Sequence, residues 1–173
     1  MADVVDVQAI ISEHATVAEG VEPGTAEWRR RVTASKIAGI MDCDPWGGTP
    51  WIMWHQLAGH FDAPEADTEA TRRGRHLEAG VADWWAEDNP EWTVTTCGTF
   101  QSRRWTWAYA TPDRLLATTS RVALMEIKTQ ADTSGWGTPE TNGVPLHYWL
   151  QGLWQCAVTG LRDVVFVVLG PFL

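Results

Sequence analysis

The residue types and spacing best suited to chemistry lie between Pro112 and Lys128. A Pro-Asp pair ends at Asp113, and Glu126-Ile127-Lys128 begins thirteen positions later. Two carboxylates and a nearby backbone carbonyl are the hard oxygen ligands that Mg²⁺ or Mn²⁺ prefers. A metal held there polarises a phosphoryl oxygen and lowers the pKa of its bound water. The pattern therefore indicates a metal-assisted hydrolytic site. It is equally typical of a surface Glu/Lys pair on an edge strand that follows an ordinary turn.

Lysine is rare in this chain, which makes its presence at position 128 informative. The chain has two lysines, Lys36 and Lys128, against eleven arginines. A compact ammonium with an adjustable pKa suits a catalytic role that a guanidinium cannot fill. Lys128 would orient or deprotonate the attacking water, or stabilise the charge that develops on phosphorus.

A strand must carry the second half of this pattern. Residues 122–128 form a short apolar run rich in β-formers and bounded by polar turn residues. Alternation along a strand places Glu126 and Lys128 on one face, and Met125 and Ile127 in the opposite layer. Buried charges need a partner or a purpose. If Asp113 ends the neighbouring strand, the three charged residues meet at one edge of a sheet.

Periodicity predicts the remaining elements. Apolar spacing predicts helices over 3–18, from Thr33 or Ser35 to Ile40, and over 51–59, 71–88 and 144–159. Alternation predicts a hairpin of strands 92–100 and 105–111, and a last strand over 162–169. Two helices have an expected buried side, formed by Trp51, Trp54 and Leu57 in one and by Leu77, Val81, Trp84 and Trp85 in the other. Residues 61–71 are expected to form an acidic linker, and 129–143 a mobile polar loop around Trp136.

Several polar residues on these helices have two interpretations. Glu78 is either a solvated charge paired with Arg72 or Arg75, or a third carboxylate that reaches the metal site. Gln151 and Gln155 share a side of the last helix with Tyr148. They either orient water or phosphate, or form hydrophilic helix surface, which the pattern alone favours. The segment from Thr33 is either an ordinary capped helix or, with arginines upstream, a phosphate site at a helix N-terminus.

Length and composition indicate one globular domain. The 173 residues include twelve tryptophans and three scattered cysteines, with no Cys-x-x-Cys spacing. An odd, scattered set of cysteines argues for a reducing compartment and against a disulfide framework or a zinc site. The N-terminus lacks the basic region of a signal peptide, and the longest apolar run, 164–169, is too short to span a bilayer. A cytoplasmic protein is expected. The abrupt end at Leu173 suggests a shortened form of a longer chain.

The net charge of −9 argues against a nucleic-acid partner, but the distribution of charge matters more than its total. Basic residues form three clusters, Arg29–Arg31 with Lys36, Arg72 with Arg73 and Arg75, and Arg103 with Arg104. If the clusters converge on one face, they make a phosphate track on an acidic body. If they scatter, they are solvated surface.

The order of motifs resembles a known family. W-R-R-R-V-T-A-S is followed by G-R-H-L-E, W-A-Y-A-T-P-D, M-E-I-K, and then P-L-H-Y-W-L-Q with V-T-G. This series resembles the YqaJ-like viral recombinases, the family of phage lambda exonuclease within the PD-(D/E)XK nuclease superfamily. The resemblance extends over residues 28–169. It implies an α/β fold with a central mixed β-sheet flanked by helices, a restriction-endonuclease-like core over 28–170, and an N-terminal helix and linker over 1–27.

The resemblance also implies a role for each matching residue. Asp113 and Glu126 would hold the metal with the Ile127 carbonyl, and Lys128 would be the catalytic lysine. Glu78 would lie behind the metal as a further acidic ligand, and Gln151 would approach the nucleophilic water or the scissile phosphate. Ser35 and an arginine among Arg29, Arg30 and Arg31 would hold the 5′-phosphate. The family's arginine lies further upstream, where this chain has Trp28, so the choice among the three arginines stays open.

The implied activity is Mg²⁺-dependent 5′-to-3′ exonuclease action on duplex DNA ends, in a phage or prophage recombination system. Mn²⁺ is the alternative metal. Family members hand the single strand to a phage annealing protein, and some act as ring-shaped homotrimers. Two other functions are considered, a structure-specific or restriction-like endonuclease of the same superfamily, and a non-catalytic DNA-binding or assembly module. An iron–sulfur relative is disfavoured, because three unclustered cysteines cannot supply the usual four ligands.

Overall fold

The computed structural model describes residues 4–61, 68–138, 141 and 143–171 and contains both helices and strands. The helices are α1 Val7–His14, α2 Ala26–Arg29, the 3₁₀ helix η1 Ala34–Lys36, α3 Ile37–Ile40, α4 Pro50–Leu57, α5 Glu69–Asp88 and α6 Leu146–Thr159. The strands are β1 Ala15–Val17, β2 Val32–Thr33, β3 Thr93–Thr95, β4 Phe100–Ser102, β5 Ala108–Ala110, β6 Arg114–Ala117, β7 Val122–Thr129 and β8 Val164–Leu169. The expected acidic linker falls largely on residues 62–67, outside the described residues.

The larger sheet has the order β3-β6-β7-β8, so β7 is one of its two inner strands. β7 runs antiparallel to β6, where Met125 faces Arg114, and parallel to β8, where Glu126 faces Phe166. This confirms the strand expected over 122–128. A strand paired on both sides is held in a single register along its whole length, so its side chains have defined positions.

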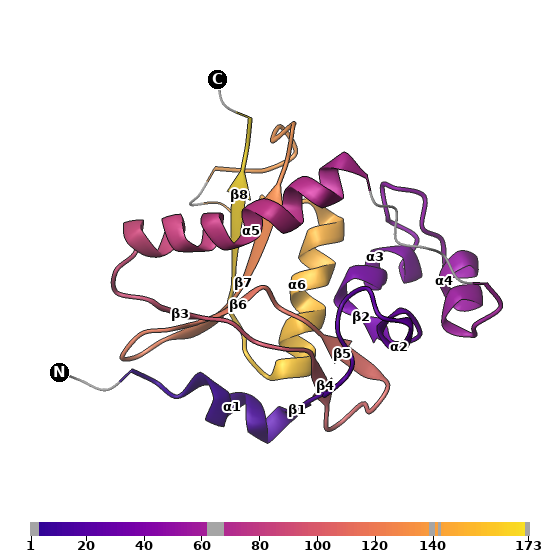
Figure 1. Ribbon diagram of the computed structural model, residues 1–173, viewed down its shortest axis with the longest axis horizontal. Helices are drawn as coiled ribbons and strands as arrows, with labels where there is room; N and C mark the ends of the chain where they lie inside the picture. Colours follow the sequence, from indigo (N-terminus) through magenta and orange to yellow (C-terminus); the bar gives the residue numbers. More distant parts are fainter. Residues whose placement is uncertain (1–3, 62–67, 139–140, 142, 172–173) are drawn as a thin grey trace.

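Helices cover both faces of this sheet (Figure 1). On one face, Met125 and Ile127 of β7 pack against Val81 of α5. On the other face, Leu124 packs in a second core with Val158 of α6. Adjacent residues of β7 thus enter opposite cores, as the period of two requires. The expected mixed α/β fold with flanking helices is confirmed.

The second sheet has the order β1-β4-β5-β2, so the strands divide between two mixed sheets. A single strand over 92–100 was expected, but this segment forms β3 and β4, which belong to different sheets. β3 pairs with β6, whereas β4 forms the hairpin with β5. The chain leaves the ladder between Thr95 and Phe100, where Cys97 donates its thiol hydrogen to the Pro112 carbonyl and Gly98 interrupts the alternation.

The expected N-terminal helix over 3–18 is shorter than its apolar period suggested. Asp6 caps α1 by accepting a hydrogen bond from the Ala9 amide, and the helix ends at His14. Residues 15–17 are extended because they pair with β4, where Ala15 faces Ser102. Hydrogen bonds to a distant strand therefore outweigh the local helical pattern at this end.

The expected buried sides of two helices were partly wrong. Trp51 and Trp54 of α4 are 66% and 58% exposed. α4 instead turns Met53 toward Gly39 of α3. On α5, Val81 is buried as expected, but Leu77 and Trp84 are exposed. Helical spacing identifies residues that share a face, but which face another element covers depends on tertiary packing.

α6 approaches the larger sheet closely. Gly152 lies against Phe166 of β8, and a Cβ atom at position 152 would meet that ring at 3.0 Å. The helix ends at Gly160, whose φ of +78° provides the left-handed cap. The small residue at 152 brings the neighbouring Gln151 and Gln155 within reach of β7. Within the described residues, no helix has the length and apolar character needed to cross a membrane.

Candidate active site

β7 presents its two charged side chains to α6. Glu126 is 3% exposed, and its Oε1 accepts a hydrogen bond of 2.7 Å from the Lys128 Nζ. Gln151 of α6 accepts a 3.2 Å hydrogen bond from the same Nζ and donates one to Oε1 of Glu126. The expectation that Glu126 and Lys128 share a face is confirmed. A carboxylate, an ammonium and an amide therefore form one hydrogen-bonded group under α6.

Asp113 lies at the adjoining edge of the sheet, immediately before β6. Its amide donates to the Met125 carbonyl at 3.2 Å, and its Oδ2 accepts a hydrogen bond of 2.6 Å from the Ile127 amide. The N–H and C=O of one strand residue point to the same edge, so the Ile127 carbonyl also faces this side. Asp113 is thereby anchored to the backbone between Met125 and Ile127, and the three charged residues meet as the sequence led us to expect.

The pKa of Asp113 is raised to about 7. Burial is the main cause and the Glu126 carboxylate is the second, while the Ile127 amide and Lys128 act in the opposite direction. Two neighbouring carboxylates in a poorly solvated place resist ionising together. A cation bound between the two carboxylates would offset their mutual repulsion.

Lys128 is held in its charged form. Burial lowers the pKa of Lys128, but the charge and hydrogen bond of Glu126, together with the charges of Asp113 and Tyr148, outweigh burial, and the net shift is upward. A lysine with a raised pKa keeps its proton at neutral pH. Of the roles expected for Lys128, orienting water and stabilising negative charge are the ones that a charged ammonium performs directly.

Gln155 contributes a contact that the sequence pattern did not favour. This side chain is fully buried, and its Nε2 donates a 2.7 Å hydrogen bond to Oε2 of Glu126. The pattern favoured hydrophilic helix surface for Gln151 and Gln155, and this interpretation is wrong. The available signal was the shared side of Tyr148, Gln151 and Gln155 on α6, combined with the apolar character of the rest of that helix.

Glu78 of α5 reaches the site through an arginine that the sequence did not single out. Its Oε1 forms a 2.7 Å salt bridge with Nη1 of Arg114, the residue after Asp113. The same Nη1 donates to the Asp113 carbonyl. Glu78 also lies close enough to raise the pKa of Asp113 slightly. The Glu78 carboxylate is therefore linked to Asp113 through Arg114, with which it forms a salt bridge.

The oxygen donors at this edge fit a hard cation. Asp113 and Glu126 supply carboxylates and Ile127 a carbonyl, the donor types that Mg²⁺ and Mn²⁺ accept together with water. Among the described residues, no three His, Cys, Asp or Glu side chains gather in metal-binding geometry. A metal at this site would thus rest on two carboxylates, the Ile127 carbonyl and water, because Glu78 is paired with Arg114.

The basic turn that was expected to hold a 5′-phosphate lies beside the smaller sheet, in which β2 pairs with β5. Ser35 is exposed on η1, which packs against α6, and its Oγ lies 3.2 Å from Oγ1 of Thr33. Arg29 donates to the Gly24 carbonyl. Arg31 pairs with Glu27 and lies over the Tyr109 ring, 5.4 Å from its centroid.

Lys36 differs from the arginines with which the sequence grouped it. It is only 6% exposed, and its Nζ donates to the Trp28 carbonyl at 3.0 Å and to the Arg31 carbonyl at 2.8 Å. The same Nζ lies 4.2 Å from the centroid of the Trp28 ring. Lys36 is therefore an internal support of the arginine turn and no part of an exposed basic track.

The other two basic clusters lie far from each other. Arg72 pairs with Glu69 near the start of α5, whereas Arg103 donates to the Ser12 carbonyl of α1 at 2.8 Å. α5 and α1 lie on opposite sides of the molecule (Figure 1). The clusters at Arg72 and at Arg103 therefore do not lie on one face.

Comparison with known proteins identifies the family of this chain. The family model of the YqaJ-like viral recombinase domain matches residues 26–162. The chain belongs to this family. The YqaJ-like match begins at α2 and includes Asp113, the whole of β7 and α6. A search of curated proteins found no significant match.

Solved structures share the fold of this YqaJ-like chain. An alkaline exonuclease from Laribacter hongkongensis, LHK-Exo, superposes with a TM-score of 0.62 at 23% identity, covering 86% of this chain and 76% of its own. LHK-Exo in complex with dAMP gives a TM-score of 0.62 at 22% identity, covering 84% and 72%. The mixed α/β fold expected from the sequence is therefore the fold of these exonuclease structures.

Proposed function

We propose that this protein is a Mg²⁺-dependent exonuclease that digests the 5′-ended strand of duplex DNA from a free end. The observation that carries the proposal is the meeting of Asp113, Glu126 and Lys128 at one edge of β7, with Gln151 beside them. Membership of the YqaJ-like family and the fold shared with an alkaline exonuclease support a phage-type nuclease. The dAMP bound in one LHK-Exo structure is a mononucleotide, the kind of product that such an enzyme releases.

Asp113, Glu126 and the Ile127 carbonyl would hold Mg²⁺, or Mn²⁺ in its place. When bound there, the cation would lower the pKa of a coordinated water and polarise the scissile phosphate. Glu78, proposed from the family resemblance as a further ligand, acts in this geometry through Arg114, which steadies the backbone at Asp113. Its direct coordination would require Glu78 to leave Arg114.

The remaining side chains position the substrate. The Lys128 ammonium would donate hydrogen bonds to the attacking water or to a phosphate oxygen, and would offset the charge that builds up during cleavage. Gln151 contacts both Lys128 and Glu126, so it would orient the water or the scissile phosphate in relation to both. Preorganised donors of this kind contribute because they need no rearrangement at the moment of reaction.

The 5′-phosphate would bind at Ser35 and the arginine turn of Arg29, Arg30 and Arg31. Arg29 and Arg31 have intramolecular partners, Gly24 and Glu27. Arg30 lies beside Gly59, at the foot of α4. Arg30 is therefore our first candidate, because binding a phosphate there would break neither of these contacts. The turn is kept in shape by the buried Lys36.

The biological setting is proposed on the family relation alone. A single nuclease domain over 1–173, encoded by a phage or prophage, would act on DNA in the bacterial cytoplasm. It would pass the single strand to a phage annealing protein, and a homotrimeric ring is the assembly we would test first. Gel filtration with light scattering measures the oligomeric state directly.

The decisive experiment is a digestion assay on linear duplex DNA with 5′-phosphate or 5′-hydroxyl ends, with Mg²⁺, Mn²⁺ or a chelator, beside covalently closed circles. We expect mononucleotides released from the 5′-phosphorylated strand only when metal is present, with circles left intact. Cut circles would instead favour an endonuclease. Bound but uncut DNA under every metal condition would favour a non-catalytic module.

A further inference from the structure

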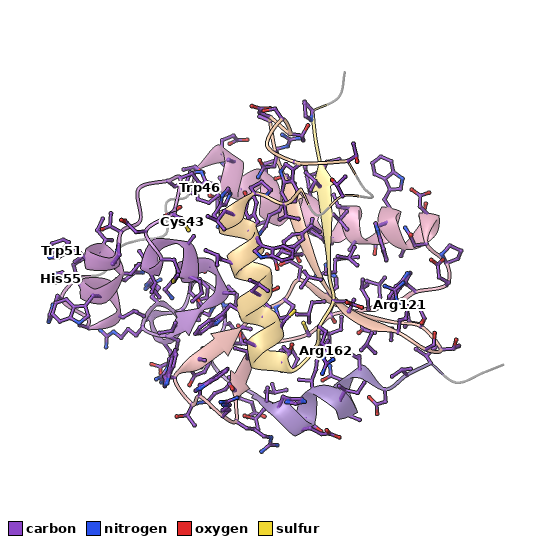
Figure 2. The ribbon with its side chains drawn as sticks, turned by 180° about the vertical axis from the view of Figure 1, so that it is seen from behind. Cys43, Trp46, Trp51, His55, Arg121 and Arg162 are labelled. Atoms are coloured by element: carbon purple, nitrogen blue, oxygen red, sulfur yellow. The ribbon has the colours of Figure 1, made fainter. Side chains whose placement is uncertain are left out.

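An exposed tryptophan stands next to the proposed active site. Trp46 is 68% exposed, although tryptophan is among the side chains with the most apolar surface to bury. It lies at the N-terminal end of α6, whereas the comparably exposed Trp51 lies on the outer side of α4 (Figure 2). The two residues thus differ in location and not in exposure.

Ring contacts connect Trp46 to the catalytic lysine. The Trp46 ring meets His147 edge-on, with centroids 4.9 Å apart, and lies 5.9 Å from the Tyr148 ring. Lys128 Nζ is 4.9 Å from the centroid of the same Tyr148 ring. Only the Tyr148 ring therefore separates a group that rests on Trp46 from the Lys128 ammonium, which contacts Glu126.

Both the ring and the hydroxyl of Tyr148 already have partners within the protein. Trp136 stacks on it at 5.4 Å with an interplanar angle of 22°, and its hydroxyl accepts a hydrogen bond from Gln130. Despite these two ring contacts, Trp46 is 68% exposed, so most of its indole surface stays open to solvent. Trp46 is thus the ring of this group that can accept a flat partner.

The backbone around Trp46 is organised in advance. Asp44 accepts hydrogen bonds from the Trp46 amide at 3.1 Å and from the Gly48 amide at 2.9 Å. Gly47, between them, has a φ of +90°, which a residue with a side chain rarely adopts. A turn fixed in this way holds the indole in place before a ligand arrives, which lowers the entropic cost of binding.

We propose that Trp46 is a base-stacking platform, on which a nucleobase of the strand being digested rests while its phosphate occupies the Lys128 site. The proposal deepens the proposed function and rests on it. Every nucleobase offers a flat π face, so stacking grips the strand without reading its sequence. It also draws a base out of the duplex, because a base stacked on Trp46 is no longer paired with its complement.

The test is a binding comparison that does not depend on cleavage. In an Asp113→Asn background, Kd is measured for 5′-phosphorylated duplex ends in which one of the first three nucleotides is intact or abasic. Intact ends should bind more tightly than one of the abasic ends by roughly five- to hundredfold, the scale of one base–aromatic stack. Trp46→Ala should abolish this difference, Trp46→Phe should retain part of it, and Trp51→Ala should retain all of it.

Each other outcome overturns the proposal. If Trp46→Ala weakens binding of intact and abasic ends equally, the indole only supports its loop. If the parent protein does not distinguish intact from abasic ends, no base is stacked at this end. If Trp46→Ala retains the full difference, the platform lies elsewhere. Absence of metal-dependent digestion would overturn the nuclease proposal separately, because the binding contrast is read without cleavage. Circular dichroism checks that each variant is folded.

Discussion

Gln155 Nε2 donates a 2.7 Å hydrogen bond to Oε2 of Glu126, and both side chains are almost completely shielded from solvent. This bond fixes the carboxylate from the side opposite Lys128. A buried carboxylate that loses such a donor is left without compensation for lost hydration, which costs about 1–3 kcal/mol or more for a charged group. The orientation of Glu126 thus depends on a residue from a helix 29 positions away in sequence.

We expect Gln155→Leu to reduce cleavage at least about tenfold, the scale seen when the support of a metal ligand is lost, and to lower the free energy of unfolding by about 1–3 kcal/mol. Urea unfolding and the rate of nucleotide release measure the two effects. Gln8→Leu, on the exposed side of α1, is the matched control and should change neither. Unchanged cleavage in Gln155→Leu would show that Glu126 keeps its position without this bond.

Asp113→Asn and Glu126→Gln should each reduce metal-dependent cleavage by about a thousandfold, the upper scale for removing one preorganised charge-stabilising group. Both substitutions keep the size of the side chain and remove its charge. The variants should remain folded by circular dichroism. Asp163→Asn, an exposed carboxylate paired with Arg121, is the control and should cleave at the parent rate. Near-parent activity in either site variant would mean that the metal lies elsewhere.

Lys128→Met should lower kcat by about a hundredfold while Kd for duplex DNA changes less than about threefold. The reason is that a preorganised cation stabilises charge that develops during cleavage more than charge already present in bound DNA. Lys128→Arg should not restore the rate, since a planar guanidinium cannot take the place of a compact ammonium between Glu126 and Gln151. Single-turnover rates and anisotropy titrations separate the two parameters. A defect in binding alone would make Lys128 a phosphate clamp.

The raised pKa of Asp113 predicts how stability changes with pH when metal is chelated. Between about pH 4 and about pH 7, folded protein retains a proton on Asp113 that the unfolded chain has released. The free energy of unfolding contributed by this residue therefore falls as pH rises through that window, and is constant above it. Asp113→Asn stays neutral, so the parent should lose stability relative to this variant from pH 4 to pH 7. Thermal melts of both proteins in EDTA test the sign.

Lys36→Met should lower the free energy of unfolding by about 1–3 kcal/mol, because the carbonyls of Trp28 and Arg31 lose a buried donor. It should also weaken the preference for 5′-phosphate over 5′-hydroxyl ends, since Lys36 supports the arginine turn. Arg162→Met, which removes a solvent-exposed cation after α6, provides the control. A full phosphate preference in Lys36→Met would separate this lysine from end recognition.

The sequence predicted the parts of the site that depend on local geometry. Alternation along a strand sufficed to place Glu126 and Lys128 on one face, and the Pro-Asp turn indicated where Asp113 would lie. It did not predict Gln155 in the core, because the burial of a helix side depends on a strand distant in sequence. The prediction that Trp51 is buried was wrong for the converse reason, since an apolar helix side is buried only if another element covers it.

β7 is paired with β6 on one side and β8 on the other. Its alternate residues pack in the apolar core under α5 or form the charged site under α6. A shift of one residue against β6 and β8 would turn Met125 and Ile127 toward α6, and would press Glu126 and Lys128 into the apolar layer under α5. Misaligned chains would thus be both unstable and inactive, so a folded population should contain few inactive molecules. Insertions and deletions in this protein should accordingly be tolerated only in its loops. Variants with residues added to or removed from β7 should fail to fold.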